Sequence, residues 1–297
     1  MQFTKAERKK AKLRLGLTGA SGSGKTYSAL QLAKGIGGRI AVIDTENGSA
    51  SLYSNDFDFD TLELDAPFRP ERFIQAIEAA ENAGYDVVII DSLTHEWTGR
   101  GGCLQINDEF AKTAMKGNSF MAWSHTTPRH QALLEKISGS KAHIIATMRA
   151  KTERVQEGKR VITLGMKPEQ RDGVEYEFTT FLDLYHETHQ AIASKDRTGL
   201  FTPEQPFLVT PQVGEALLEW LNTGVPIYVE KDQENELVSI FNQLPEASKM
   251  AIKQKYPSHD GVKEVDFSVV KVSGFETAKT YMMGIIERAK QQSEVAQ

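Results

Sequence analysis

The chain has 297 residues, with 35 lysine and arginine side chains against 40 aspartate and glutamate side chains, so its formal net charge is −5. Hydrophobic residues make up 40% of the chain, an ordinary globular composition that excludes disordered and collagen-like proteins. No segment approaches the ~20 consecutive apolar residues of a membrane-spanning helix, and the first residues lack the apolar run of a signal peptide. The lone cysteine, Cys103, forms no internal disulfide, so we expect a cytoplasmic protein that does not associate with a membrane.

The first two thirds of the chain alternates short apolar runs with helical patterns, which predicts an α/β fold with a mainly parallel central sheet. The expected strands are 13–17, 39–43, 61–64, 85–90 and 142–146, and the expected helices are 25–36, 71–83 and 128–138. Thr127 is the predicted N-cap of the last helix, with Pro128 as its first helical residue. A hairpin is expected at 152–164, followed by strands at 180–186 and 189–194.

The β-type pattern stops near residue 225, and short helical patterns follow it. We therefore predict a core domain at 13–225 and a small helical C-terminal domain at 226–297. Residues 1–14 carry six basic side chains and one acidic side chain, so we expect a basic N-terminal tail at 1–12. A second basic segment, 149–171, has seven basic and three acidic side chains.

The first motif with a specific chemistry follows the first expected strand. It consists of Gly19, Ala20, Ser21, Gly22, Ser23, Gly24, Lys25 and Thr26, and it matches G-x-x-x-x-G-K-[ST] at every fixed position. The glycines let successive backbone N–H groups surround a nucleotide phosphate at the positive end of the next helix. Lys25 is the predicted catalytic contact to the β- and γ-phosphates, and Thr26 is a predicted Mg²⁺ ligand. The sequence therefore predicts ATP and Mg²⁺ as ligands, with GTP left open.

A carboxylate at the end of a buried strand should complete the metal site. Asp91 follows four aliphatic residues, 87–90, which is typical of a strand buried on both faces. We predict that Asp91 binds the Mg²⁺ shell through water. Ser92 occupies the position at which many P-loop ATPases have a water-activating glutamate, so Glu46 and Glu96 remain as candidates. Glu46 is favoured, because it lies at the carboxyl end of a strand, where open α/β sheets bind ligands.

Three segments resemble, in order and spacing, the ATPase core of RecA-type recombinases: 19–26, 42–46 and 86–92. Two further segments, 92–97 and 143–151, are similar to phage-encoded AAA-family ATPases, some of which are RecA-like single-strand annealing proteins. The resemblance covers residues 10–205. It implies a RecA-like P-loop core, with Glu46 as the catalytic acid that polarises the attacking water. It also implies ATP hydrolysis and a role on single-stranded DNA in phage recombination or annealing.

The resemblance also assigns residues outside the nucleotide motifs. Lys195 and Arg197 resemble a K-x-R element that reaches the γ-phosphate of a neighbouring subunit, which implies a homo-oligomeric ring or filament. Thr147 occupies the position of a polar sensor, although RecA itself has an amide side chain there. The basic segment occupies the position of a DNA-binding loop, and its expected DNA contacts are Arg149, Lys151, Arg154, Lys159 and Arg160. The alternative for this segment is a solvated hairpin.

Two other functions remain open at this stage. The chain is alternatively an ATPase switch that loads or recruits a recombination or replication protein through residues 226–297. It is alternatively a P-loop small-molecule kinase with segment 149–171 as its lid. His186 and His189 have the spacing of a metal-ligand pair, but no further ligand lies at suitable spacing, so we predict that they are ordinary turn residues.

Overall fold

The computed structural model describes residues 5–157, 160–226, 228–258 and 263–295. Its contacts divide the chain into two compact units, residues 12–221 and residues 1–11 together with 222–297. The grouping differs from the separate N-terminal tail expected at 1–12. Lys9 pairs with Val225 in a β-bridge, and the Lys10 ammonium lies 2.7 Å from the carboxylate of Glu230. These contacts join the N-terminal segment to the C-terminal residues.

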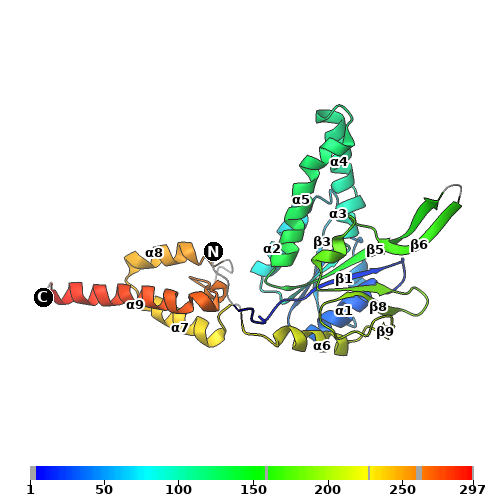
Figure 1. Cartoon of the computed structure of the whole chain (residues 1–297). Coiled ribbons are helices and arrows are strands. Elements are labelled where there is room, and N and C mark those ends of the chain that lie inside the picture. Colours follow the sequence, from blue (N-terminus) through cyan, green and yellow to red (C-terminus); the bar gives the residue numbers. More distant parts are fainter. Residues whose placement is uncertain (1–4, 158–159, 227, 259–262, 296–297) are drawn as a thin grey trace. The chain divides into compact units, whose positions relative to one another are not determined.

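The larger unit is built on one central sheet (Figure 1). Its strands are β1 (Arg14–Gly19), β2 (Ile40–Asp44), β3 (Asp60–Glu63), β4 (Val87–Asp91), β5 (His143–Glu157), β7 (Thr180–Leu184), β8 (Gln190–Asp196) and β9 (Phe207–Leu208), and β6 (Arg160–Pro168) pairs with β5. The order across the sheet is β3-β2-β4-β5-β1-β7-β8-β9. Strands β1 to β5 and β7 pair in parallel, while β8 and β9 are antiparallel. The predicted mainly parallel sheet is confirmed.

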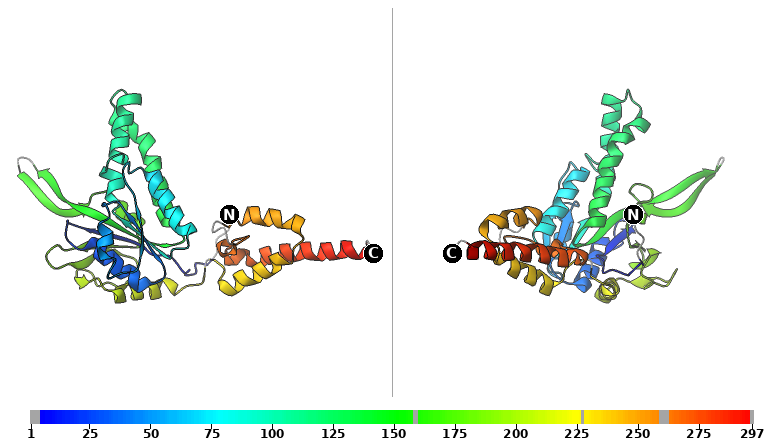
Figure 2. Two further views of the ribbon diagram at one scale, coloured as in Figure 1. Left: turned by 180° about the vertical axis from the view of Figure 1, so that it is seen from behind. Right: turned by 60° about the vertical axis from the view of Figure 1, so that its left-hand side comes forward.

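Helices cover both faces of this sheet (Figures 1 and 2). Helices α1 (Lys25–Ile36) and α6 (Pro211–Asn222) pack on one face, and α2 (Pro70–Asn82) and α5 (Ser119–Gly139) pack on the other. Alternate aliphatic residues of the strands enter the two cores, which is why their sequences are continuous apolar runs. The shorter helices are α3 (Thr94–Thr98), α4 (Cys103–Ala114), η1 (Ser49–Tyr53) and η2 (Val174–Glu177).

Helix α5 corrects one expectation. It begins at Ser119, nine residues before the predicted start, and Pro128 lies inside it. Asn118 is the N-cap, and its side chain accepts a hydrogen bond of 3.1 Å from the Met121 N–H. Asparagine is a strong N-cap, and a proline inside a helix removes a single backbone donor. The early turns are stabilised by packing against α4, with Ala122 and Thr126 buried.

The β5–β6 hairpin extends beyond the sheet (Figure 1). Residues 150–157 pair with residues 160–168, so the hairpin expected at 152–164 is present and longer than predicted. Its two strands converge at Arg149, whose carbonyl accepts a hydrogen bond from the Glu169 N–H. Lys159 lies outside the described residues, and Arg154 and Arg160 lie in β5 and β6.

The smaller unit contains three main helices. They are α7 (Lys231–Asn242), α8 (Glu246–Lys255) and α9 (Val272–Val295), with the short η3 (Phe267–Val269). Their apolar faces form a core of their own, in which Leu237, Phe241 and Phe267 are almost fully buried. Within the described residues of the whole chain, every helix is too short or too polar to cross a membrane.

Candidate active site

The loop between β1 and α1 has the backbone geometry of an anion site. Gly22 and Gly24 have φ angles of 78° and 86°, in the left-handed region that favours glycine. Gly19 is restricted by packing, because a Cβ at this position would lie 2.4 Å from the hydroxyl of Ser23. Gly24 is the N-cap of α1 and offers no side-chain acceptor to the first turn. The first N–H groups of the helix therefore fit a phosphate oxygen.

Lys25 lies folded against this loop. Its ammonium donates hydrogen bonds to the carbonyl oxygens of Gly19 (3.1 Å) and Ala20 (2.9 Å). Burial lowers the pKa of the ammonium, while the nearby Asp91 and Glu46 carboxylates act in the opposite direction. A bound phosphate would offer this cation a charged acceptor in place of two neutral ones.

Asp91 connects the phosphate loop to the neighbouring strand. The Thr26 hydroxyl donates a 2.6 Å hydrogen bond to Asp91 Oδ2, and the Thr147 hydroxyl donates to Oδ1. Asp91 is 2% exposed, and this burial raises its pKa. The sheet order explains the contact, because β5 lies between β4 and β1. The adjacent Thr26 and Asp91 oxygens are hard ligands of the kind that Mg²⁺ prefers, so these residues fit the predicted metal.

The Glu46 carboxylate follows β2 and is paired with the guanidinium of Arg149. Arg149 Nη2 lies 2.7 Å from Oε2 and 2.8 Å from Oε1, and Nε lies 3.1 Å from Oε1. The Ser92 hydroxyl also donates to Oε1, at 3.3 Å. Burial raises the pKa of Glu46, but the hydrogen bonds and charge of Arg149 outweigh it, so the net shift is downward. The guanidinium expected on a DNA-contacting surface is thus engaged beside the phosphate loop.

A network beneath Glu46 holds the ends of β2 and β4 together. The Asp44 carboxylate accepts a 2.6 Å hydrogen bond from the Glu46 N–H. Thr45 Oγ1 accepts a 2.8 Å hydrogen bond from the Ser92 N–H and lies 2.7 Å from Nδ1 of His95. Burial lowers the pKa of His95. The sequence alone assigns no role to Thr45 and His95, because their proximity depends on the pairing of β2 with β4.

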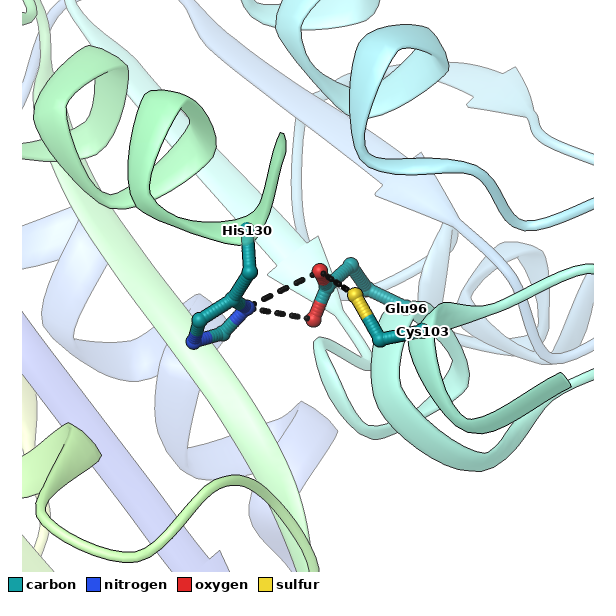
Figure 3. Close-up of side chains that lie close together, drawn as sticks. All are labelled: Glu96, Cys103 and His130. Carbon is teal, nitrogen blue, oxygen red and sulfur yellow. Dashed lines mark hydrogen bonds and ion pairs between the residues drawn. The ribbon is translucent and has the colours of Figure 1, made fainter. Parts of the chain in front are cut away.

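Glu96, the other candidate acid, lies in a different environment (Figure 3). Its side chain is fully buried and accepts hydrogen bonds from Cys103 Sγ (2.9 Å) and Gln170 Nε2 (3.1 Å). His130 Nδ1 lies 3.0 Å from the same carboxylate. Burial raises the pKa of Cys103 far above its usual range, which keeps this thiol protonated as a donor. Glu96 is therefore enclosed by donors from α4, α5 and the segment after β6, whereas Glu46 lies beside Lys25.

The structure places Lys195 and Arg197 at the opposite end of the sheet from the phosphate loop. Lys195 pairs with Phe181, which in turn pairs with Gly16. Gly16 precedes Gly19 by three residues, or about 10 Å along a strand, and two strand spacings add to this separation. Neither side chain is close to the phosphate loop of the same chain.

The two cations differ in their local contacts. The Lys195 ammonium donates 2.8 Å hydrogen bonds to the carbonyl oxygens of Glu175 and Tyr176, and burial lowers its pKa. The Arg197 guanidinium is exposed and makes no hydrogen bond or ion pair with any side chain in the described part of the chain. Arg197 is thus the more available of the two.

The turn between β7 and β8 lies against the phosphate loop. A Cβ on Gly22 would lie 3.2 Å from Cε1 of His186, and a Cβ on Gly24 would lie 3.6 Å from Nδ1 of His189. Both histidines are exposed. Their place follows from the pairing of β7 with β1, which local sequence does not reveal.

A family model described as an AAA domain matches residues 11–208. The match covers two thirds of the chain and includes every site residue described above. No curated protein matches the chain.

Proposed function

The chain belongs to the AAA-domain family, and on that premise we propose that it is a Mg²⁺-dependent ATPase acting on single-stranded DNA in phage recombination or annealing. The observation that carries the ATPase proposal is the shared carboxylate of Asp91. It joins Thr26 of the phosphate loop to Thr147 of the next strand. This arrangement gives the phosphate loop both a metal-binding acid and a polar side chain on the strand that leads into the hairpin.

The proposed roles follow from these positions. When bound, Mg²⁺ neutralises charge on the phosphate oxygens, and Thr26 and Asp91 would hold it. Lys25 exchanges its carbonyl partners for the β- and γ-phosphates. Glu46 accepts a hydrogen bond from the attacking water and orients it. Thr147 acts as the sensor that links the metal-binding acid to β5.

The proposed contact with single-stranded DNA is supported by the hairpin and its charge. Lys151 is exposed at the start of the projecting part of β5, and the hairpin also carries Arg154, Lys159 and Arg160. Cations on such an element contact phosphates without selecting a base sequence. Arg149 differs from them, because its side chain contacts the acid of the hydrolysis site.

The proposed homo-oligomer is supported by the position of the K-x-R element. Lys195 and Arg197 lie too far from their own phosphate loop to act there, so a role in hydrolysis requires a second subunit. A cation supplied in trans stabilises the charge of the transition state and couples hydrolysis to assembly.

The test is steady-state ATP hydrolysis over a range of protein concentrations, with and without oligo-dT. We expect the specific activity to rise cooperatively with protein concentration and to increase on addition of DNA, and Lys25→Ala to abolish it. A rate that is linear in protein and indifferent to DNA would contradict the DNA and assembly parts. It would point to an acceptor substrate or a protein partner of residues 226–297. A folded wild-type protein without ATP turnover would contradict the ATPase itself.

A further inference from the structure

We infer that Arg149 is a positioning residue that restrains hydrolysis by pairing with Glu46, and that DNA phosphates at the base of the β5–β6 hairpin release this restraint. The inference rests on the proposed function and adds its regulation. It distinguishes Arg149 from the other basic residues expected to contact DNA, because its side chain contacts Glu46 in the candidate active site.

Arg149 and Glu46 form a two-pronged ion pair. The guanidinium contacts both carboxylate oxygens of Glu46, with three N–O distances between 2.7 and 3.1 Å. Ser92 donates to the same Oε1 at 3.3 Å. A carboxylate that orients water needs an accessible lone pair and sufficient basicity, and a bound cation reduces both. The paired state is therefore a poor acceptor for the attacking water.

Arg149 lies between the candidate active site and the hairpin. Its N–H donates a 2.9 Å hydrogen bond to Thr94 Oγ1, and its carbonyl accepts from the Glu169 N–H at the end of the hairpin. The backbone is thus held on both sides, so the side chain is the part that can change partner. The pair is accessible, with 45% of the Arg149 side chain and 27% of the Glu46 side chain exposed.

A phosphate group can take the place of Glu46 on the Arg149 guanidinium. A guanidinium binds phosphate with the same two-pronged geometry that it uses for carboxylate. A nucleic acid strand lying along the hairpin would bring several phosphates to the exposed side of Arg149. An ion pair of this exposure contributes at most about 1 kcal/mol, which corresponds to about a fivefold change in population. The restraint is therefore weak enough to be released by ordinary DNA binding.

The experiment compares Arg149→Ala and Arg149→Lys with the wild type, with Glu46→Gln as the inactive reference. Arg100→Ala is the matched control, because Arg100 is exposed and has no side-chain partner in the part of the chain that the structure describes. For each protein, kcat and KM for ATP are measured with and without oligo-dT, and affinity is measured with a fluorescent ATP analogue. We expect Arg149→Ala to raise kcat without DNA by about fivefold and to lose most of the DNA stimulation. KM and nucleotide affinity should stay unchanged, Arg149→Lys should be intermediate, and Arg100→Ala should match the wild type.

Two results would overturn the inference. If Arg149→Ala loses hydrolysis as Glu46→Gln does, while nucleotide affinity is kept, Arg149 assists the reaction directly. If its stimulation by oligo-dT equals that of the wild type, DNA does not act through this residue. Failure of the proposed function has a different signature, because the wild type itself would then lack ATP turnover. If the wild type hydrolyses ATP without responding to DNA, DNA is not the trigger. The rate of Arg149→Ala without DNA then tests the restraint by itself, because a rate no higher than that of the wild type would contradict it.

Discussion

Replacing Glu96 should lower the stability of the fold, whereas replacing Glu46 should lower the rate of ATP hydrolysis. Glu96 is fully buried and accepts hydrogen bonds from Cys103 and Gln170, and His130 completes its surroundings. Glu96→Ala removes both acceptor oxygens together and leaves several buried donors without a partner. Breaking such a network by removing one partner costs about 3–5 kcal/mol of unfolding free energy. Glu96→Gln keeps the shape and one acceptor oxygen, so we expect a smaller loss of about 1–3 kcal/mol.

Replacing Glu46 should have the opposite effect, with little change in stability and a large loss of hydrolysis. Its pair with Arg149 is partly exposed, so Glu46→Gln should change the unfolding free energy by less than about 1 kcal/mol. The same change removes the carboxylate that we propose orients the attacking water, and loss of a general base typically lowers the rate by about 10²–10⁴-fold. Glu96→Gln should instead retain hydrolysis in the fraction of protein that is folded.

The change in unfolding free energy is measured by urea denaturation, with tryptophan fluorescence as the signal. Trp97 and Trp123 stack with ring centroids 5.4 Å apart, and Trp97 lies 5.3 Å from the ring of His130. Their emission therefore reports on the region around Glu96. ATP turnover is then normalised to the folded fraction. If Glu96→Gln abolishes normalised turnover while Glu46→Gln retains it, the assignment of the two acids is inverted.

Three further predictions concern assembly, packing and pH. Mixing the inactive Lys25→Ala and Arg197→Ala variants should restore ATP hydrolysis at up to about a quarter of the interfaces, because one subunit supplies an intact phosphate loop and the other supplies Arg197. If no activity returns, Arg197 does not act in trans. Gly16→Ala should lower the unfolding free energy by about 1–3 kcal/mol, because its Cβ would lie 2.3 Å from a phenylalanine ring of β7, whereas Gly139→Ala meets nothing within 4 Å and should be neutral or stabilising in urea denaturation. Burial raises the pKa of Asp183 to about 6 from 3.8, so the folded state binds this proton more tightly than the unfolded state does. The unfolding free energy should therefore fall as pH rises from about 4 to 6, by about 3 kcal/mol at most from this group. Asp183→Asn should remove that part of the pH dependence when unfolding is measured across this range.

The phosphate loop and the strand pattern could be predicted because both are local. Residues 19–26 place their glycines and polar groups at fixed spacing, and the aliphatic run before Asp91 indicates a strand buried on both faces. The start of α5 could not be predicted in this way. Its first turns contain the exposed apolar residues Phe120 and Met121 and are stabilised by packing against α4, so Pro128 is the stronger local signal of a helix start. The sequence already favours Glu46 over Glu96, but the different surroundings of the two acids depend on which strands and helices meet.

Strand β5 shows why the remaining contacts were not readable from sequence. It runs between β4 and β1, and side chains two residues apart on a strand share a face about 6.6 Å apart. Thr147 therefore reaches Asp91, and Arg149 reaches Glu46. Lys151, two residues further on, is exposed where the hairpin leaves the sheet. One strand thus links Asp91, Glu46 and the projecting hairpin at a fixed spacing. Because each link depends on the neighbours of β5 in the sheet, the sequence reveals the three residues but not their partners.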